Sequence, residues 1–218
     1  MLVKDCMTRH PIMVTPKTPA AEAQKLMVEN KVRHLPVVGD GKRLLGLITR
    51  QRLAIKSDIL GSLNVWEITR RLANLTVKDV MLAAKSVYTI TSDKTVERAA
   101  KLLAEHRIGC LPVIEDGVVV GIITEIDLLQ SYQEMLGLPV DGIRITMRMP
   151  NRPGEFAKLA QVLVDHQWGV MGIGTFPSPR CEGYYDAVLK IPNLTAEAAK
   201  AAFSQITTQE IIDLREIV

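Results

Sequence analysis

The apolar and polar positions in the first half of the chain follow one pattern that occurs twice. A short apolar run precedes a segment in which apolar residues recur at helical spacing, as Val96, Ala99, Ala100 and Leu103 do. Two further apolar runs come next, joined by an Asp-Gly pair that favours a tight β-hairpin turn. A second helical segment ends the pattern, which therefore predicts the element order β-α-β-β-α in each copy.

The predicted bounds follow from these positions. Strands are expected at residues 13–15, 34–38 and 44–48, and again at 88–91, 110–114 and 118–123. Helices are expected to begin at Pro19 and after Thr49 in the first copy. Their counterparts begin at Thr95 and after Thr124, and the last one ends near residue 136.

The two copies also share their sequence. Val-Lys-Asp-x-Met at 3–7 returns at 77–81, Leu-Pro-Val at 35–37 returns at 111–113, and Gly46-x-Ile-Thr49 returns as Gly121-x-Ile-Thr124. The number of residues between matching positions varies from 74 to 76. The length changes fall in turns, as expected of two copies of one folded unit. A unit of about 55 residues buries too little surface to be stable alone, so we expect the copies to share a core as a pseudo-twofold pair.

The last eighty residues follow a different pattern. An alternating strand at 143–149 precedes a helix with apolar Phe156, Leu159, Ala160, Leu163 and Val164, whose start Asn151 is expected to cap. Strands at 169–176 and 184–191, a helix from Thr195 and a strand at 211–218 complete β-α-β-β-α-β. The fold class is therefore α+β, with a first repeat at 1–58, a helical connector at 59–76 around Trp66, a second repeat at 77–136 and a last domain at 141–218.

Composition narrows the class of protein. With 47% apolar and 23% charged residues the chain has enough material for packed cores. The net charge is only +3 and no dense Lys/Arg block occurs, so neither a nucleic-acid surface nor a membrane surface is expected, and a few phosphates are the most it suggests. Cys6, Cys110 and Cys181 are scattered, which argues against disulfides and structural zinc and, with no leader or membrane-spanning run, favours the cytoplasm.

Residues 1 to about 135 resemble a tandem CBS domain pair. The resemblance rests on the Met-Thr opening at 7–8, the Leu-Pro-Val strands and the Gly-h-h-Thr-x-x-Asp end at 121–127, where h is apolar. Such pairs bind adenosine nucleotides, which implies that Asp127 accepts both ribose hydroxyls while Thr124 and helix-start N–H groups face phosphate. The alternative is that Thr124 and Asp127 form only a capping box at the start of the helix.

The first copy departs from this motif, because Arg52 stands where Asp127 stands in the second. An arginine cannot accept a ribose hydroxyl, so this site is either empty, phosphate-selective or specific for another ligand. Gly109 is expected to let a base lie close to the backbone, and His34 is alternatively an ordinary surface residue on an edge strand. The resemblance assigns the remaining nucleotide-binding positions to Thr15, Arg33, His34, Thr49, Thr91, Gly109, Cys110 and Pro112.

Residues 141–218 resemble an ACT domain, with Asn-Arg-Pro-Gly-Glu-Phe at 151–156 in place of the family's Asp/Asn-x-Pro-Gly-x-Leu turn. ACT domains bind an amino acid, often across a dimer interface, and the matching turn residues here are Asn151, Pro153 and Gly154. The replacement of Leu by Phe156 is expected to crowd the floor of such a pocket. The alternative is that Pro153 and Gly154 only make a tight turn and that the domain dimerises without a ligand.

The sequence offers no catalytic motif and no cluster of metal ligands, so we expect neither a catalytic site nor a metal site. A CBS pair followed by an ACT domain is similar to the acetoin-utilisation regulatory proteins of bacteria. The leading hypothesis is a cytoplasmic, homodimeric sensor that needs no cofactor, binds AMP or ATP, takes an amino acid as a further candidate ligand, and acts on an unidentified target protein. S-adenosylmethionine and NAD are alternative ligands, and the competing hypothesis is a scaffold that dimerises without any ligand.

Overall fold

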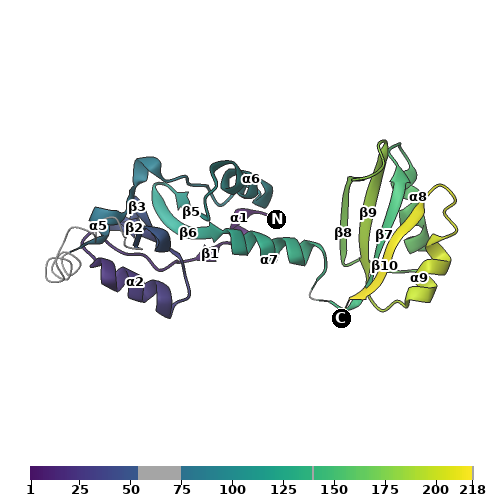
Figure 1. Ribbon diagram of the computed structural model, residues 1–218, viewed down its shortest axis with the longest axis horizontal. Coiled ribbons are helices and arrows are strands. Elements are labelled where there is room, and N and C mark those ends of the chain that lie inside the picture. Colours follow the sequence, from purple (N-terminus) through teal and green to yellow (C-terminus); the bar gives the residue numbers. More distant parts are fainter. Residues whose placement is uncertain (54–74, 139, 218) are drawn as a thin grey trace, which may run out of the picture. The chain divides into compact units, whose positions relative to one another are not determined.

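The computed structural model describes residues 1–53, 75–138 and 140–217 of the chain. The chain folds into two compact units, Met1–Leu128 and Leu129–Val218 (Figure 1). The division falls inside helix α7 (Glu125–Met135), eight residues before the end of the second repeat predicted at residue 136. The predicted connector at 59–76, with Trp66, lies outside the described residues apart from its last two positions.

The first unit contains both repeats. The first repeat consists of α2 (Ala20–Glu29), β2 (His34–Val38), η1 (Asp40–Lys42), β3 (Leu44–Thr49) and α3 (Arg50–Leu53), where the described segment ends. The second consists of η3 (Ala84–Ser86), α6 (Val96–His106), β5 (Cys110–Glu115), β6 (Val118–Thr124) and α7. The predicted opening strands at 13–15 and 88–91 are reduced to single parallel bridges, Val14 with Val37 and Ile90 with Val113.

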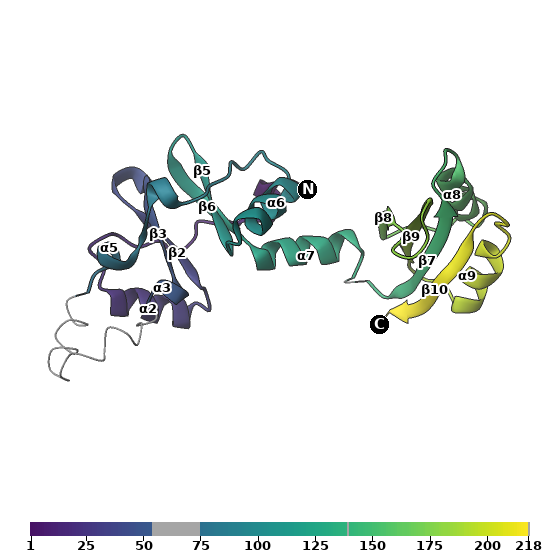
Figure 2. The same ribbon diagram turned by 45° about the horizontal axis from the view of Figure 1, so that its top comes forward.

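The opening segment of each sequence repeat packs on the other repeat. Helix α1 (Val3–Cys6) and strand β1 (Thr8–Arg9) join the second repeat, where β1 extends the sheet in the order β1-β6-β5. Helix α5 (Val77–Val80) and strand β4 (Leu82–Ala83) join the first repeat, in the order β2-β3-β4. Val3 and Val77 are both fully buried, each in the core of the repeat to which it does not belong in sequence. This crossing, visible in Figure 2, was not predicted.

The crossing explains the glycine in each Gly-x-Ile-Thr motif. A Cβ on Gly46 would lie 2.3 Å from the carbonyl oxygen of Leu82 and 2.8 Å from Sδ of Met81. A Cβ on Gly121 would lie 2.6 Å from Sδ of Met7 and 3.1 Å from the carbonyl oxygen of Thr8. Each glycine therefore leaves the space through which the crossing segment passes.

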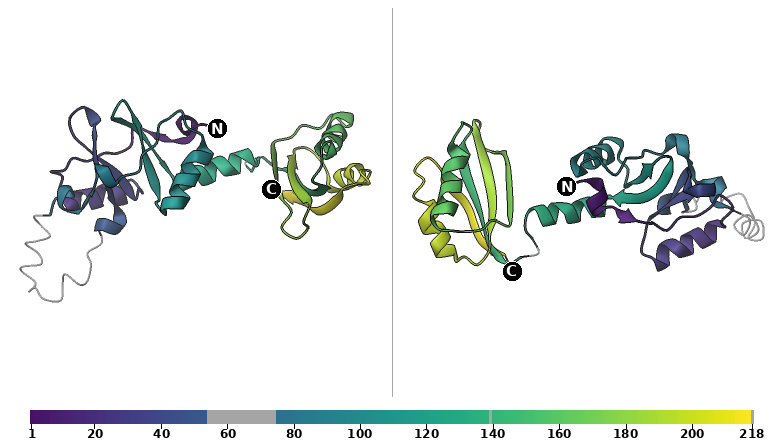
Figure 3. Two further views of the ribbon diagram at one scale, coloured as in Figure 1. Left: turned by 90° about the horizontal axis from the view of Figure 1, so that it is seen from above. Right: turned by 180° about the vertical axis from the view of Figure 1, so that it is seen from behind.

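Each repeat has its own core, and a third cluster joins them. The seam between the repeats contains buried Leu47, Cys110 and Ile122, with Leu82 and Val87 packed against them. Leu47 and Ile122 occupy equivalent positions in β3 and β6, which is consistent with the expected pseudo-twofold pair that shares buried surface. Figure 3 shows the sheets of the two repeats, β2-β3 and β5-β6, side by side.

The second unit has the predicted element order β-α-β-β-α-β. Its elements are β7 (Gly142–Pro150), α8 (Glu155–Asp165), β8 (Gly172–Pro177), β9 (Tyr184–Ile191), α9 (Ala196–Phe203) and β10 (Glu210–Ile217). The strands form one antiparallel sheet in the order β10-β7-β9-β8, and α8 and α9 cover one face of it (Figure 1). The core between the helices and the sheet includes Ile145, Met147, Leu159, Leu189 and Phe203, all fully buried.

Two expectations for this unit were wrong. Asn151 does not cap α8, because Gly154, in a left-handed conformation with φ of 88°, is the N-cap residue and no side chain caps the helix. The Pro-Gly turn thus starts the helix four residues after Asn151, beyond the reach of its side chain. The predicted apolar face of this helix also included residues that the structure exposes. Leu159 is buried, but Val164 is 67% exposed and Phe156 is 43% exposed.

Candidate functional site

A cavity of about 420 Å³ lies between the two repeats of the first unit. The first repeat contributes the segment before β2 and the start of α3, and the second contributes the segments before and after α6 and the first residue of α7. The walls of the cavity are formed mainly by Arg33, His34, residues 49–52, residues 86–88, residues 107–110 and Glu125. The site therefore combines the start of α3 in the first repeat with the segments that precede and follow α6 in the second.

The start of α3 is held by Thr49. Its Oγ accepts a hydrogen bond from the backbone N–H of Arg52 at 3.3 Å. The guanidinium of Arg52 donates from Nη1 to the carbonyl oxygen of Val80 at 3.2 Å, which fixes this side chain against the crossing helix α5. Thr49 and Arg52 both line the cavity, so this corner presents a hydroxyl and a cation.

The start of α7 is the equivalent corner of the second repeat, and there the carboxylate of Asp127 accepts two bonds from Thr124. The Thr124 backbone N–H and Oγ each donate to Oδ2 at 2.7 Å, while the Thr124 Oγ accepts from the Asp127 N–H at 3.4 Å. This is the capping arrangement that formed the alternative interpretation of the motif. Thr124 is the cross-strand partner of Cys110, and the N–H of Glu125 donates to the Gly109 carbonyl at 3.2 Å. The motif therefore borders the cavity, although neither Thr124 nor Asp127 lines it.

The two repeats are in close contact at Gly109. A Cβ at this position would lie 3.0 Å from Cε1 and 3.1 Å from Nε2 of His34. The His34 ring thus lies against Gly109. Burial and the neighbouring Arg33 lower the pKa of His34 below its ordinary value of 6.5, partly offset by Glu125, so the imidazole is neutral at pH 7.

Cys110 occupies the position equivalent to His34 in the second repeat. Its side chain is 2% exposed, and burial together with the charge of Glu125 raises its pKa to about 12. The thiol is therefore protonated and unreactive at physiological pH. Its contribution to the cavity is a small apolar surface at the seam.

Tyr88 is a cavity residue that the sequence analysis missed. Its ring stacks on His106 with a centroid distance of 3.7 Å and an interplanar angle of 13°. The stack holds the phenol ring in a fixed orientation where it lines the cavity, with 46% of the residue exposed. An aromatic ring fixed in this way can stack on a planar ligand group.

The predicted nucleotide-site residues thus fall into two groups. Arg33, His34, Thr49, Gly109 and Cys110 line the cavity. The other five hold local structure. Thr124 and Asp127 form the cap described above, the Thr15 N–H donates to Oγ of Thr18, the Thr91 Oγ donates to Asp93, and the Pro112 carbonyl accepts from Ile90. These five remain predictions as ligand contacts.

A second cavity, of about 450 Å³, lies within the second unit beside the Asn-Arg-Pro-Gly turn. Its lining is largely apolar and includes Met149, Phe156, Ile173 and Tyr185. Asn151 lines it, whereas Pro153 and Gly154 do not. Phe156 lines the same cavity, and its crowding of an amino-acid pocket stays a prediction.

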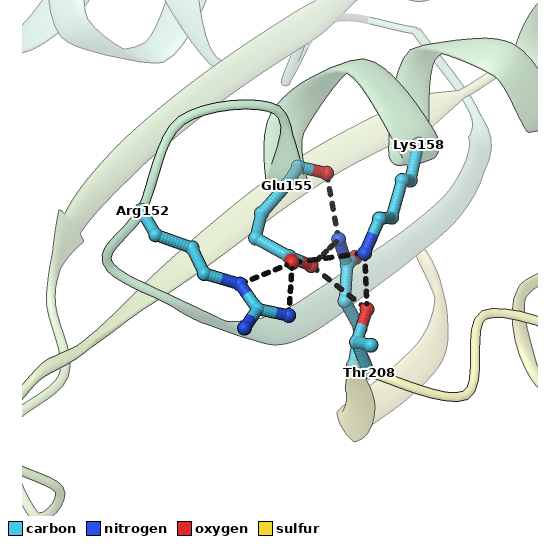
Figure 4. A network of polar contacts seen from close by, with 5 residues as sticks. Arg152, Glu155, Lys158 and Thr208 are labelled. Carbon is cyan, nitrogen blue, oxygen red and sulfur yellow. Dashed lines mark hydrogen bonds and ion pairs between the residues drawn. The ribbon is translucent and has the colours of Figure 1, made fainter.

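Glu155 organises the turn beside this second cavity, as Figure 4 shows. Its carboxylate, 3% exposed, accepts hydrogen bonds from Arg152 Nε at 2.8 Å, Lys158 Nζ at 2.9 Å and Thr208 Oγ at 2.8 Å. These donors, the lysine first, lower the pKa of Glu155 to about 2. Both cations near the cavity are consequently already paired with an anion.

The part of the chain that the structure describes holds no group of three or more His, Cys, Asp or Glu side chains placed to bind a metal ion. Within the same residues, no helix combines the length and the apolar character needed to cross a bilayer.

Comparison with known families bears on the first unit. The model of the CBS domain family matches residues 3–57 and 77–134, which together make up just over half of the chain. The chain belongs to the CBS domain family. The match covers the two sequence repeats and ends near the end of α7.

Solved structures of CBS proteins resemble the same region. One is a putative acetoin utilization protein (AcuB) from Vibrio cholerae, 29% identical, covering 64% of this chain and 95% of that chain with a TM-score of 0.53. Another is CBSX2, an Arabidopsis thaliana protein, in complex with AMP, 29% identical over 62% of this chain and 97% of that chain with a TM-score of 0.52. The CBS domain pair of protein MJ0100, in complex with 5′-methylthioadenosine and S-adenosylmethionine, is 26% identical over 61% and 99% with a TM-score of 0.50.

Curated relatives include whole enzymes. An L-aspartate semialdehyde sulfurtransferase of Methanocaldococcus jannaschii is 29% identical over 60% of this chain but only 23% of that protein. A homoserine O-acetyltransferase of Methanocorpusculum labreanum is 30% identical over 62% of this chain and 25% of that protein. The chain spans about a quarter to a half of the length of the first curated relatives, and its similarity to these enzymes is a partial one over the CBS region.

Proposed function

We propose that this chain is a cytoplasmic regulatory protein whose CBS pair binds an adenosine nucleotide between its repeats and transmits the ligand state to a partner protein. AMP and ATP are the proposed ligands, and S-adenosylmethionine and NAD are alternatives. The observation that carries the proposal is the 420 Å³ cavity, because both repeats form it and its volume suits a small molecule. Related CBS pairs in complex with AMP or S-adenosylmethionine support the ligand class, and three free cysteines support a reducing compartment.

The proposed transmission uses the seam. A ligand that contacts Thr49 on one side and Gly109 on the other bridges the repeats directly beside the shared cluster of Leu47, Cys110 and Ile122. Such a ligand favours one arrangement of the repeats over another by the difference in its affinity for the two. A coupling of about 1 to 3 kcal/mol is enough for a regulatory response.

Asp127 remains our predicted ribose anchor at the corner equivalent to Thr49 and Arg52. Thr124 engages this carboxylate in the capping arrangement described above, and Asp127 does not line the 420 Å³ cavity, so its proposed ribose contact belongs to a second ligand position at the start of α7. By this proposal the two corners of the pair differ in ligand contact, with ribose at one and phosphate at the other.

For the second unit we propose an ACT domain that binds an amino acid in the 450 Å³ cavity. The β-α-β-β-α-β order and the position of the cavity at the Asn-Arg-Pro-Gly turn support this assignment. Because Phe156 and Ile173 line the cavity, an amino acid with an apolar side chain suits it best. Calorimetry with leucine, phenylalanine and serine tests this, and equal absence of binding for all three would contradict it.

We also propose that the protein is a homodimer. Helix α7 carries exposed Ile126, Leu129, Tyr132 and Met135 at three-residue spacing, and each is between 48% and 59% exposed. These side chains wind around about half of the helix circumference, with Leu129 and Tyr132 at the centre, and an exposed apolar patch of this kind is typical of a surface that packs against a partner. Light scattering on the purified chain tests the prediction, and a Leu129→Glu, Tyr132→Glu variant is expected to be monomeric.

The relationship to the acetoin utilization protein suggests a regulatory role of that kind, and the test of the sensor hypothesis is ligand stabilisation. At a ligand concentration a hundred times Kd, binding adds about 2.7 kcal/mol to the free energy of unfolding. We expect AMP or ATP to raise the melting temperature of the purified chain. If AMP, ATP, S-adenosylmethionine and NAD all leave it unchanged, the ligand-independent scaffold is the better explanation.

A further inference from the structure

The cavity between the repeats is strongly cationic. Arg33, Arg50, Arg52 and Arg107 line it, and among the described residues Glu125 is the one acidic residue in its lining. Two of the arginines lie at the start of α3, one lies before β2 and one directly follows α6. Segments far apart in the sequence thus place four arginines in the lining of one cavity.

These arginines differ from most of those in the second unit. There Arg144, Arg148 and Arg152 each form an ion pair with a carboxylate within 3.0 Å. Among the described residues, none of the four cavity arginines forms an ion pair, and Arg52 makes its bond to a neutral carbonyl. Like charges held close together repel one another, so this arrangement favours an anionic occupant.

On the basis of the proposed nucleotide binding in this cavity, we propose that it selects its ligand by the phosphate chain, binding nucleoside di- and triphosphates in preference to AMP and S-adenosylmethionine. Arginine donates in a planar fork that matches phosphate oxygens and cannot accept a ribose hydroxyl. With Arg52 where the second repeat has Asp127, the ribose loses its charged anchor and the phosphates gain one. The positive sulfonium of S-adenosylmethionine is repelled by the same groups.

The remaining walls fit the rest of such a ligand. Tyr88, supported from behind by His106, offers an aromatic face for the base. Leu47, Leu82 and Val87 add an apolar surface from the seam. His34 does not compete with the arginines for the phosphates, since burial and Arg33 keep its imidazole neutral.

The test is calorimetric titration of the full chain with ATP, ADP, AMP and inorganic tripolyphosphate. We expect ATP to bind at least tenfold more tightly than AMP, and tripolyphosphate to compete with ATP. A double variant, Arg33→Gln with Arg107→Gln, is expected to lower ATP affinity at least tenfold while changing AMP affinity less than threefold. Arg98→Gln, at an exposed position on α6 outside the cavity lining, is the matched control and should bind as the parent does.

A second variant tests the exchanged motif position directly. Arg52→Asp is expected to reduce or reverse the preference for ATP over AMP, because it replaces a phosphate donor by a ribose acceptor. Arg52→Asp also loses the hydrogen bond to the Val80 carbonyl. If this variant shows no cooperative thermal unfolding transition, Arg50→Gln replaces it as the variant that removes one cavity arginine.

The possible results distinguish selection by the phosphate chain from nucleotide binding itself. Equal affinities for ATP and AMP, or a preference for ATP that survives the arginine variants unchanged, would overturn phosphate selection in this cavity while leaving nucleotide binding intact. Absence of binding by every nucleotide would overturn the proposed function itself.

Discussion

The two repeats of the CBS pair start the same helix with different chemistry. In the second repeat, the carboxylate of Asp127 accepts hydrogen bonds from the backbone N–H and the hydroxyl of Thr124, three residues earlier in the same motif. In the first repeat, Arg52 occupies the same place, and its cation reaches the carbonyl of Val80 and lines the cavity. The backbone arrangement survives the change because a Thr hydroxyl alone can accept the helix-start N–H. Duplication thus kept the fold and left the ligand chemistry free to diverge.

The same comparison shows that the repeats are mutually dependent. Each repeat donates its opening helix and strand to the other. Gly46 in β3 and Gly121 in β6 leave room for the crossing segments. The crossing is tighter in the first repeat, where backbone meets Gly46, than in the second, where the nearest atom belongs to the flexible Met7 side chain. The repeats should therefore respond unequally to matched substitutions.

The largest expected difference concerns these glycines. Gly46→Ala places a Cβ 2.3 Å from a backbone oxygen that cannot move without displacing β4, and should cost about 3 kcal/mol of unfolding free energy. Gly121→Ala meets a methionine end that can rotate away, and should cost about 1 kcal/mol. Urea unfolding of both variants measures the difference, and equal losses would show that the crossing segments are equally constrained.

The next effect tests the crossing itself. Val3→Ala and Val77→Ala each remove buried methyl groups and should each destabilise the chain by roughly 2 kcal/mol. Hydrogen exchange should increase in β5 and β6 for Val3→Ala and in β2 and β3 for Val77→Ala, opposite to the sequence order. If each variant instead loosens the repeat in which it lies in sequence, the crossing is wrong.

Asp127 allows the proposed ribose contact to be separated from capping. Asp127→Asn keeps an acceptor for the Thr124 N–H but removes the charge, and should weaken AMP binding roughly tenfold to a hundredfold. Asp79→Asn is the matched control, because Asp79 caps α5 through Thr76 with similar geometry and stands at no position that the CBS resemblance assigns to the ligand. Unchanged AMP affinity in Asp127→Asn would leave Asp127 as a helix cap only.

The smallest effect is a pH dependence that differs between equivalent positions. The pKa of His34 lies below its ordinary 6.5 in the folded chain, so protonation favours unfolding and its contribution to stability is lost as pH falls below about 6.5. The pKa of Cys110 is raised from 9.0 to about 12, so ionisation favours unfolding and stability is lost as pH rises above about 9.

Denaturant unfolding across this pH range, on the parent and on His34→Gln and Cys110→Ala, measures both contributions. The first variant should be less sensitive to acid and the second less sensitive to alkali. Profiles that run parallel to that of the parent in both variants would show that neither group contributes.

Helices and strands whose ends are marked by nearby residues were predictable from the sequence. The bounds of β2 and β9 agree with the prediction at both ends, because apolar runs and turn residues delimit them. The short helices α1 and α5 were not predicted, because their single buried valine each packs against a segment distant in sequence. Local periodicity carries no information about which repeat such a segment joins.

The candidate site was predicted only in part for the same reason. His34, Gly109 and Thr49 were recognised from motif positions, but the motif did not reveal that Thr49 shares a cavity with the other repeat's Gly109. Tyr88 has no motif, and its role depends on a stack with His106 that only the fold creates. The Arg52 substitution was visible in the sequence, whereas its three arginine neighbours required the tertiary structure.

A crystal structure of the full chain grown with ATP tests the central claim most directly. The account predicts a nucleotide in the cavity between the repeats, with its phosphate chain within hydrogen-bond distance of at least two of Arg33, Arg50, Arg52 and Arg107 and its base on Tyr88. A crystal in which the nucleotide lies elsewhere and these arginines face an empty cavity at saturating ATP would contradict it.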